Sequence, residues 1–213
     1  MEAVVRTQIA RAHGLAQEFP DGHRVLDETP DIPGEPRVRV LLERGRLFRS
    51  AGDTSAAVPL FLQAYEQAMT LKLAGLAADT AHMMALVLPG EHEEWAARGL
   101  AAAEGSDDPL AQGMVGALLN NLGWSLADEE KWDDAYPLFD RAVAARTAVF
   151  ESTGTRAAAN SLHVARWTRA RAARAVGRND EALAELRELA ITEIGAADPY
   201  VAEELAFHES KGE

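Results

Sequence analysis

The chain repeats one spacing of small and apolar residues, and this spacing limits the folds that it can adopt. Three copies begin with a small residue and continue at +12, +16 and +19, and a fourth begins with a histidine. The steps of four and three place the later residues on one face of a helix. Copies lie 37, 41 and 47 residues apart, a period typical of arrays of helical hairpins. The copies begin at Gly45 (Ala57, Phe61, Ala64), His82 (Ala96, Leu100, Ala103, after a two-residue insertion), Gly123 (Ala135, Phe139, Ala142) and Ala170 (Ala182, Leu186, Leu189).

Each copy predicts two helices joined by a turn, in which the small first residue lets the second helix approach closely. Pro59 and Pro137 have no backbone donor, so we expect them in the first turn of a second helix, where donors are unpaired. These second helices are expected to start near Thr54 or Ser55 and near Asp133, since all three residues suit an N-cap.

The composition favours helix as well. The chain has 42 alanines but 13 valines and 4 isoleucines, and β-branched residues are the ones that dominate strands. Its net charge of −13 argues against nucleic acid as a partner, because nucleic acid binding needs a basic surface. No run approaches the roughly 20 apolar residues of a membrane helix, and charges interrupt the first 19 residues where a signal peptide would be apolar. We therefore expect an all-α cytoplasmic protein without a membrane partner.

The repeated units resemble the tetratricopeptide repeat (TPR) family. The copy over residues 119–147 follows that family's pattern most closely, through Leu122, Gly123, Leu126, Trp132, Ala135, Phe139 and Ala142. The long spacing between copies resembles the extended-helix variety of bacterial regulatory proteins, and the stretch at 120–124 resembles uncharacterised bacterial members. The resemblance implies a right-handed α-solenoid of TPR-like hairpins, a scaffold whose motifs say little about which ligand it binds.

Three segments follow from this interpretation. Residues 1–36 are expected to hold an N-terminal helix and a proline-rich linker with at most one helical turn near Val25 and Leu26. Residues 37–194 are expected to form four TPR-like hairpins. Residues 195–213 are expected to form a capping helix that starts at Asp198 and covers the last hairpin, because a terminal repeat otherwise exposes its stacking face.

The side of each first helix that does not pack carries arginine, asparagine and tryptophan, although the chain is acidic overall. Arginine offers a planar fork of donors to a carboxylate, and tryptophan adds apolar contact area. We expect a concave groove that binds a protein or peptide with an acidic or C-terminal carboxylate group. The candidate partner-binding residues are Arg39, Arg46, Arg49, Asn120, Asn121, Trp124, Trp167, Arg171 and Arg174.

Two functions remain open on these grounds. The first is a protein- or peptide-binding scaffold or regulatory module, and the second is a self-associating domain whose groove is filled by its own segment or by a second copy, as a homodimer. An enzyme is not expected: the chain has no cysteine, no H-x-x-x-H pair and no phosphate-binding loop. We therefore predict no catalytic residues, no metal and no cofactor.

Overall fold

The computed structural model describes residues 2–211, which form eleven α-helices and one short 3-10 helix and include no strand. The all-α class expected from the sequence is confirmed. In chain order the elements are α1 (Glu2–Leu15), α2 (Phe19–Asp27), α3 (Glu35–Ser50), α4 (Thr54–Thr70), α5 (Ala74–Val87), α6 (His92–Ala103), α7 (Pro109–Asp128), α8 (Trp132–Thr153), α9 (Arg156–Ala175), α10 (Asn179–Ala190), the 3-10 helix η1 (Gly195–Ala197) and α11 (Pro199–Lys211).

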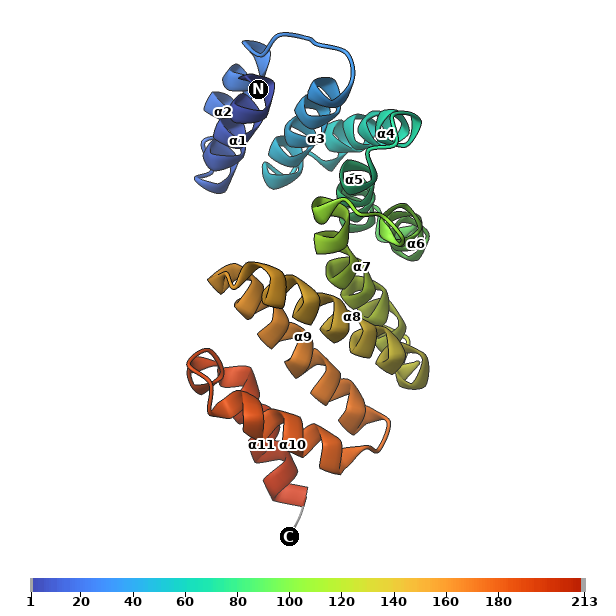
Figure 1. Ribbon diagram of the computed structural model, residues 1–213, viewed down its shortest axis with the longest axis vertical. Helices are drawn as coiled ribbons and strands as arrows, with labels where there is room; N and C mark the ends of the chain where they lie inside the picture. The colour runs from blue at the N-terminus through green and yellow to red at the C-terminus, as the bar shows by residue number, and fades with distance from the viewer. Residues whose placement is uncertain (1, 212–213) are drawn as a thin grey trace. The chain divides into compact units, whose positions relative to one another are not determined.

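Successive helices pair as hairpins (Figure 1), and α3/α4, α5/α6, α7/α8 and α9/α10 are the four that the repeated spacing predicts. The chain divides into two compact units, Met1–Met114 and Val115–Glu213, and helix α7 contributes residues to both. Each unit is described by itself below.

Glycine and phenylalanine form the central contact of two hairpins. A Cβ atom built on Gly45 would lie 2.5 Å from Cε1 of Phe61, and one built on Gly123 would lie 2.6 Å from Cε1 of Phe139. Both phenylalanine rings are fully buried. The small residue on the first helix therefore makes room for the ring of the second, as the spacing predicts.

The turns inside these hairpins share one backbone conformation. Gly52, Glu130 and Gly177 have φ values of 86°, 61° and 82°, in the left-handed region, and the N-cap residue that follows each has a ψ value of 74°, 57° and 57°. Helix α4 is capped by Asp53, whose carboxylate accepts a hydrogen bond from the backbone of Ala56 at 3.0 Å.

Both second helices that carry a proline start at or beside the predicted positions, but their N-caps are Asp53 and Lys131. Helix α4 begins at Thr54 and α8 at Trp132, so the predicted N-caps lie inside the helices. Pro59 and Pro137 are consequently in the second turn rather than the first. There each proline removes one intrahelical hydrogen bond.

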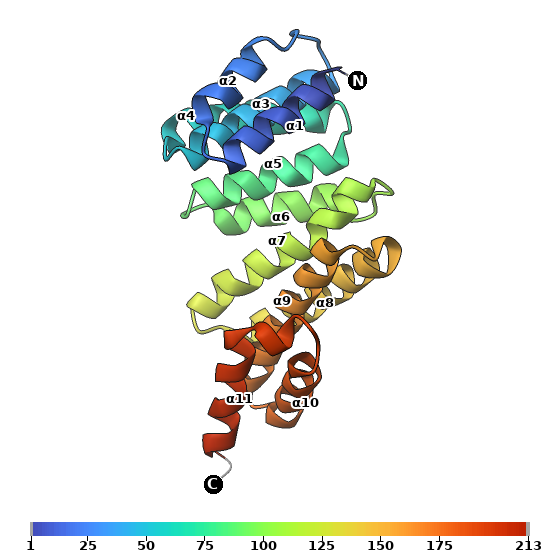
Figure 2. The ribbon, with the colours of Figure 1, turned by 90° about the vertical axis from the view of Figure 1, so that its left-hand side faces the viewer.

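The N-terminal segment differs from the expected linker, because α2 is a nine-residue helix that forms a fifth hairpin with α1 (Figure 2). The turn has the same form, with Gln17 at φ 61°. Ala10 lies seven residues before this turn, as Gly45 does before Gly52. The offsets +12, +16 and +19 from it reach Gly22, Leu26 and Thr29, which are all buried.

Helix α11 covers the last hairpin, as a capping helix would. Val201 is buried against Ala170, Leu186 and Leu189 of α9 and α10. At the start of the helix, Oδ2 of Asp198 lies 2.7 Å from Nε2 of His163 on α9.

Two glycines of α7 provide a matched test of the hairpin contact. We expect Gly123→Ala to destabilise the fold by about 1–3 kcal/mol, because its methyl group would overlap the Phe139 ring. Gly113→Ala meets no atom within 4 Å and should instead stabilise the helix by about 0.5–1 kcal/mol. Urea unfolding followed by circular dichroism measures both, and equal effects would contradict the proposed contact.

Removal of residues 198–213 should lower the melting temperature by several degrees, because Leu186 and Leu189 would become exposed. Glu203→Ala changes an exposed position on the same helix and serves as the control that leaves the melting temperature unchanged. An unchanged melting curve for the truncated chain would show that α11 does not act as a cap.

Candidate functional site

In the second unit, α9 lies between α7 and α11 and contacts both. Helix α7 is the first helix of the third predicted hairpin, α9 is the first helix of the fourth, and α11 is the capping helix. The surface that they share, called here the α7–α9–α11 face, carries most of the residues that the sequence predicts for partner binding.

Three of the predicted residues meet at the centre of this face. The rings of Trp124 and Trp167 lie 6.5 Å apart between centroids, and the Arg171 guanidinium lies 5.6 Å and 5.8 Å from them. Both distances are within the range of a cation–π interaction. The Tyr200 ring, 5.6 Å from Trp167, extends the cluster onto α11. We call Trp124, Trp167, Arg171 and Tyr200 the aromatic ledge.

Trp124 also belongs to the hairpin core. Its ring contacts Phe139 at 5.4 Å and Trp132 at 6.2 Å, both edge to face. The Trp124 ring is half-buried, so one side supports the α7/α8 packing and the other side forms part of the ledge.

Arg174 is held by the capping helix of its own chain. It forms an ion pair with Glu204, and its guanidinium lies 4.2 Å from the centroid of the Phe207 ring. Trp167 is engaged at the same boundary, where its indole N–H donates to the backbone oxygen of Tyr200 at 3.2 Å. The charge of Arg174 is therefore compensated within the chain.

The two predicted asparagines lie in different surroundings. Asn120 lines a pocket of about 250 Å³ between α7 and α9, which we call the Arg146 pocket. Asn121 is half-buried outside this lining, and its backbone oxygen accepts a hydrogen bond from Ser125 at 3.1 Å. The pocket is lined by Gly116, Asn120, Arg146, Asn160, Ser161, Val164 and Ala165.

Arg146, Asn160 and Ser161 were not predicted. Asn160 stands seven residues before the predicted Trp167 on α9, so the helical spacing places both on one face and would have indicated Asn160. Arg146 lies on a second helix, and only the first helices were considered for the groove.

In the first unit, Arg39 and Arg46 line a pocket of about 290 Å³ formed by α1, α3, α5 and the first turns of α7. Arg46 forms ion pairs with Glu43 and Asp79. Burial opposes its charge, but attraction and hydrogen bonds from both acids outweigh burial and hold the pKa of Arg46 above its usual value.

The other two predicted arginines of this unit are more exposed. Arg39 pairs with Glu35 one turn earlier, at 2.7 Å. Arg49 lies at the exposed end of α3 and does not line the pocket. The structure therefore does not bring Arg49 together with Arg39 and Arg46.

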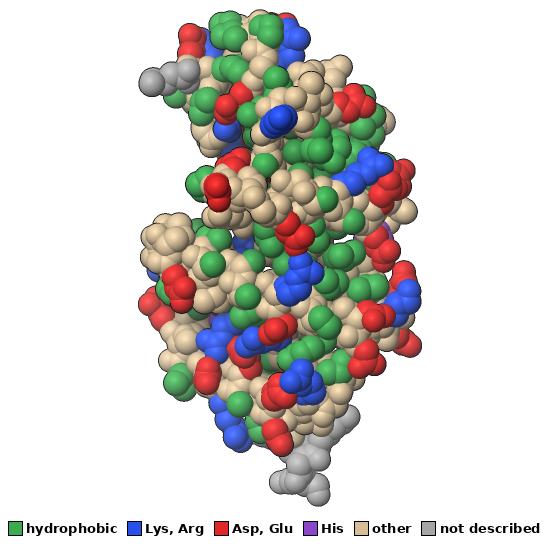
Figure 3. All heavy atoms as spheres, turned by 45° about the vertical axis from the view of Figure 1, so that its right-hand side comes forward, with side chains coloured by type: hydrophobic (Ala, Val, Ile, Leu, Met, Phe, Trp, Pro, Cys, Tyr) green, Lys and Arg blue, Asp and Glu red, His purple; other side chains and the backbone are tan. Residues whose placement is uncertain are grey.

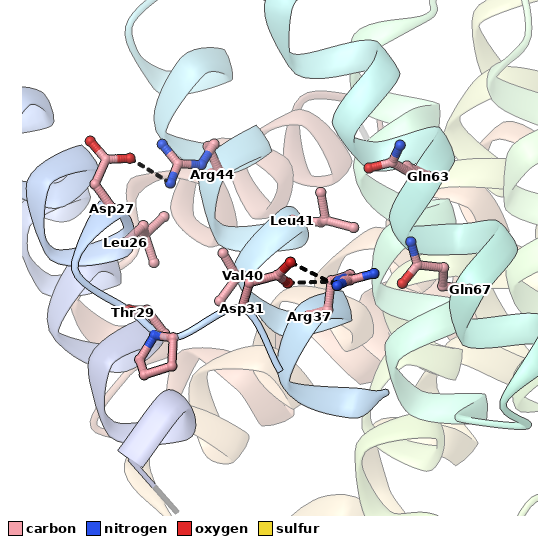
Figure 4. Close-up of a pocket in the computed structure, with 11 residues that line it drawn as sticks. Leu26, Asp27, Thr29, Asp31, Arg37, Val40, Leu41, Arg44, Gln63 and Gln67 are labelled. Atoms are coloured by element: carbon pink, nitrogen blue, oxygen red, sulfur yellow. Dashed lines mark hydrogen bonds and ion pairs between the residues drawn. The ribbon is translucent and has the colours of Figure 1, made fainter. Parts of the chain in front are cut away.

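The largest of the described pockets, about 540 Å³, lies between α2, α3 and α4 (Figure 4). The Asp31 carboxylate accepts two hydrogen bonds from Arg37, each 2.7 Å long, and Asp27 pairs with Arg44 at 2.8 Å. Both arginines of this pocket are thus compensated within the chain. Acidic and basic side chains are also interspersed over the molecular face that Figure 3 shows.

One group of possible metal ligands occurs in the described part of the chain, although the sequence predicts no metal. Ligand atoms of His13, Glu18 and Asp21 lie within 4.8 Å of one another. His13 Nδ1 already contacts Glu18 at 2.7 Å, and Asp21 pairs with Arg24 at 2.6 Å. Their spacing of five and three residues spans the α1/α2 turn, which the sequence analysis did not recognise.

None of the described helices is long and apolar enough to cross a membrane. No protein-family model and no curated protein matches the chain. Solved structures do match it, among them two crystal structures of a putative kinesin light chain with nearly identical TPR-like repeats from Podosopora anserina, one of them carrying a substitution.

The substituted protein has a TM-score of 0.59 and 18% identity, over 86% of this chain and 91% of that chain. The other has a TM-score of 0.59 and 16% identity, over 100% of this chain and 98% of that chain. At such low identity the likeness concerns the fold alone. The chain therefore has a TPR-like helical-repeat fold, and the resemblance drawn from its sequence is confirmed at that level.

Two single variants separate packing from binding in the aromatic ledge. Trp124→Ala should destabilise the protein by about 2–3 kcal/mol, because it removes ring contacts with Phe139 and Trp132. Arg171→Ala removes only the partly exposed cation above the rings, so its melting temperature should change little. Thermal unfolding measures both, and a large loss of stability for Arg171→Ala would mean that the ledge is part of the core.

Proposed function

We propose that the chain is a protein-binding scaffold, and that it captures a partner segment along the α7–α9–α11 face. The observation that carries the proposal is the aromatic ledge, where Arg171 lies beside both Trp124 and Trp167. Tryptophan, tyrosine and arginine are the residues most enriched at the energetic centres of protein interfaces. The TPR-like fold supports the same class of function by analogy only.

The stripe on α9 has a length that suits an extended segment. Asn160, Val164, Trp167 and Arg171 follow one another at helical spacing, so they share one side of the helix. Val164 is 52% exposed, so it adds apolar surface to this side of the helix. The stripe is about 16 Å long, and about five residues of extended chain would cover it.

Binding, rather than catalysis, is the function that these residues support. The ledge offers apolar area and one cation, and we infer no reaction from it. The proposal keeps the cytoplasmic location that the sequence predicts.

Self-association is the alternative, and one observation favours its intramolecular form. Helix α11 supplies Glu204 and Tyr200 to groups on α9 that a partner would otherwise meet. In the intermolecular form, a second copy would bind on the α7–α9–α11 face. The protein would then form a dimer whose population rises with concentration.

A panning experiment tests the proposal. The immobilised full chain is expected to enrich peptides from a phage-displayed random library, and the selected peptides should bind in fluorescence anisotropy. Arg171→Ala should weaken this binding about tenfold, because it removes one interface cation. Arg187→Ala, which removes the same charge from an exposed position on α10, is the matched control.

Sedimentation velocity at several concentrations tests the self-associating alternative. If no peptide is enriched and the sedimentation coefficient rises with concentration, the self-associating alternative replaces the proposed function. Peptide binding that survives both Arg171→Ala and Trp167→Ala would move the binding site away from the ledge.

A further inference from the structure

Arg146 differs from the other half-buried arginines of the second unit. Arg166, Arg169 and Arg174 each form an ion pair with an acid of a neighbouring helix, and Arg171 lies beside the rings of Trp124 and Trp167. The Arg146 guanidinium makes no hydrogen bond, ion pair or ring contact with any residue that the structure describes. Burial lowers the pKa of Arg146, and no neighbouring acid offsets this effect. A cation withdrawn from water without a partner is costly, so this one calls for an explanation.

The position of Arg146 depends on a glycine of the facing helix. A Cβ atom built on Gly116 of α7 would lie 2.6 Å from Nε and 2.8 Å from Cδ of Arg146. The absence of a side chain at Gly116 thus lets the arginine of α8 reach the gap between α7 and α9. There it lines the Arg146 pocket together with Asn160 and Ser161 of α9.

A second unsatisfied group lines the same pocket. The side-chain oxygen of Asn120 is buried and has no hydrogen-bond partner. Buried polar atoms in folded proteins are nearly always hydrogen-bonded, so an orphaned acceptor beside an orphaned cation is informative. A ligand that completes both would present an anionic acceptor to Arg146 and an N–H donor to Asn120.

A peptide with an acidic side chain has both groups within one residue. Its carboxylate matches the planar fork of a guanidinium, and its backbone supplies the N–H. An inorganic anion without a proton, such as sulfate, offers the acceptor without the donor.

A second hollow of about 230 Å³ shares Arg146 and Ser161 with the Arg146 pocket, and it is lined by Arg146, Val149, Thr153, Thr155, Ala157, Ala158 and Ser161. The Arg146 pocket itself includes Val164 of the α9 stripe. Two hollows that share Arg146 favour a chain that passes this residue over a chain that ends there.

We propose that the Arg146 pocket binds the side-chain carboxylate of an aspartate or glutamate within an extended segment of a partner protein. Arg146 binds the carboxylate, and Asn120 accepts the backbone N–H of the same segment. This inference rests on the proposed function, since the pocket lies at one end of the α9 stripe whose other end is the aromatic ledge. It also moves the acid-binding role from the first-helix arginines to an arginine of a second helix.

Four randomised peptide pools test the chemistry. Three pools consist of nonapeptides with blocked ends and a fixed central residue, which is glutamate, glutamine or phosphoserine. The fourth pool has glutamine at the centre and a free C-terminus. We expect the wild-type chain to prefer the glutamate pool over each of the other three by about tenfold, as for a charge-assisted hydrogen bond. Equal binding of the glutamate and glutamine pools would overturn the inference. A preference for phosphoserine or for the free C-terminus would do the same.

Variants connect this preference to Arg146. Arg146→Gln should remove the preference for glutamate, and Arg146→Lys should retain part of it because the charge remains. Arg187→Gln removes the same charge from the surface of α10 and should leave the preference intact. A preference that survives Arg146→Gln contradicts the inference.

The two proposals fail in different ways. Peptide binding that is lost in Arg171→Ala but is indifferent to both glutamate and Arg146 would leave the proposed function standing and remove only the carboxylate pocket. Absence of binding to every pool would contradict both.

Stability measurements exclude a merely structural role. Arg146→Met keeps the apolar stem and removes the unpaired charge, so the melting temperature should rise or stay the same. Arg169→Met is the contrast, because it leaves Glu185 and Asp140 without their partner and should lower the melting temperature. A lower melting temperature for Arg146→Met would mean that the arginine holds the helices together, and would overturn its assignment as a binding group.

Discussion

Each hairpin depends on how closely its two helices approach at one small residue of the first helix. In α3/α4 the Phe61 ring lies over Gly45, and in α7/α8 the Phe139 ring lies over Gly123. A buried ring in contact with backbone fixes the rotation of the second helix, because residues three and four positions apart share its face. The other side of the first helix then remains free to meet a neighbouring hairpin, a capping helix or a partner.

The electrostatics of that remaining side follow from what the neighbouring helices supply. Arg46 lies between Glu43 and Asp79, and Arg174 is held by Glu204 of α11. A partly buried cation needs an acid close by, because the free energy that it loses with its hydration is larger than the attraction from distant charges. Arg146 is also partly buried but has no acid beside it, and this contrast is the basis on which we propose that it binds a ligand.

The candidate site was only partly predictable, for physical reasons that differ between residues. Trp124, Trp167 and Arg171 were predicted because the 3.6-residue period places each away from the packing stripe of a first helix, although the Trp124 ring also packs against Phe139. The hairpin of α1 and α2 was missed because several prolines suggested a linker, although Pro20 lies in the first turn of α2, where a proline is tolerated. The turn before it has Gln17 in place of glycine, so composition did not reveal it.

The sequence by itself determined the all-α class and the hairpins, because the offsets that encode a helix face are local and survive without knowledge of the neighbours. Only the tertiary structure decided which arginines keep an unbalanced charge. Asp79, one of the two partners of Arg46, and Glu204, the partner of Arg174, lie 33 and 30 residues away along the chain, on helices whose approach no local pattern specifies. Arg146 reaches its pocket because Gly116 on another helix leaves room for it, a relation that exists only once α7 and α8 are packed together.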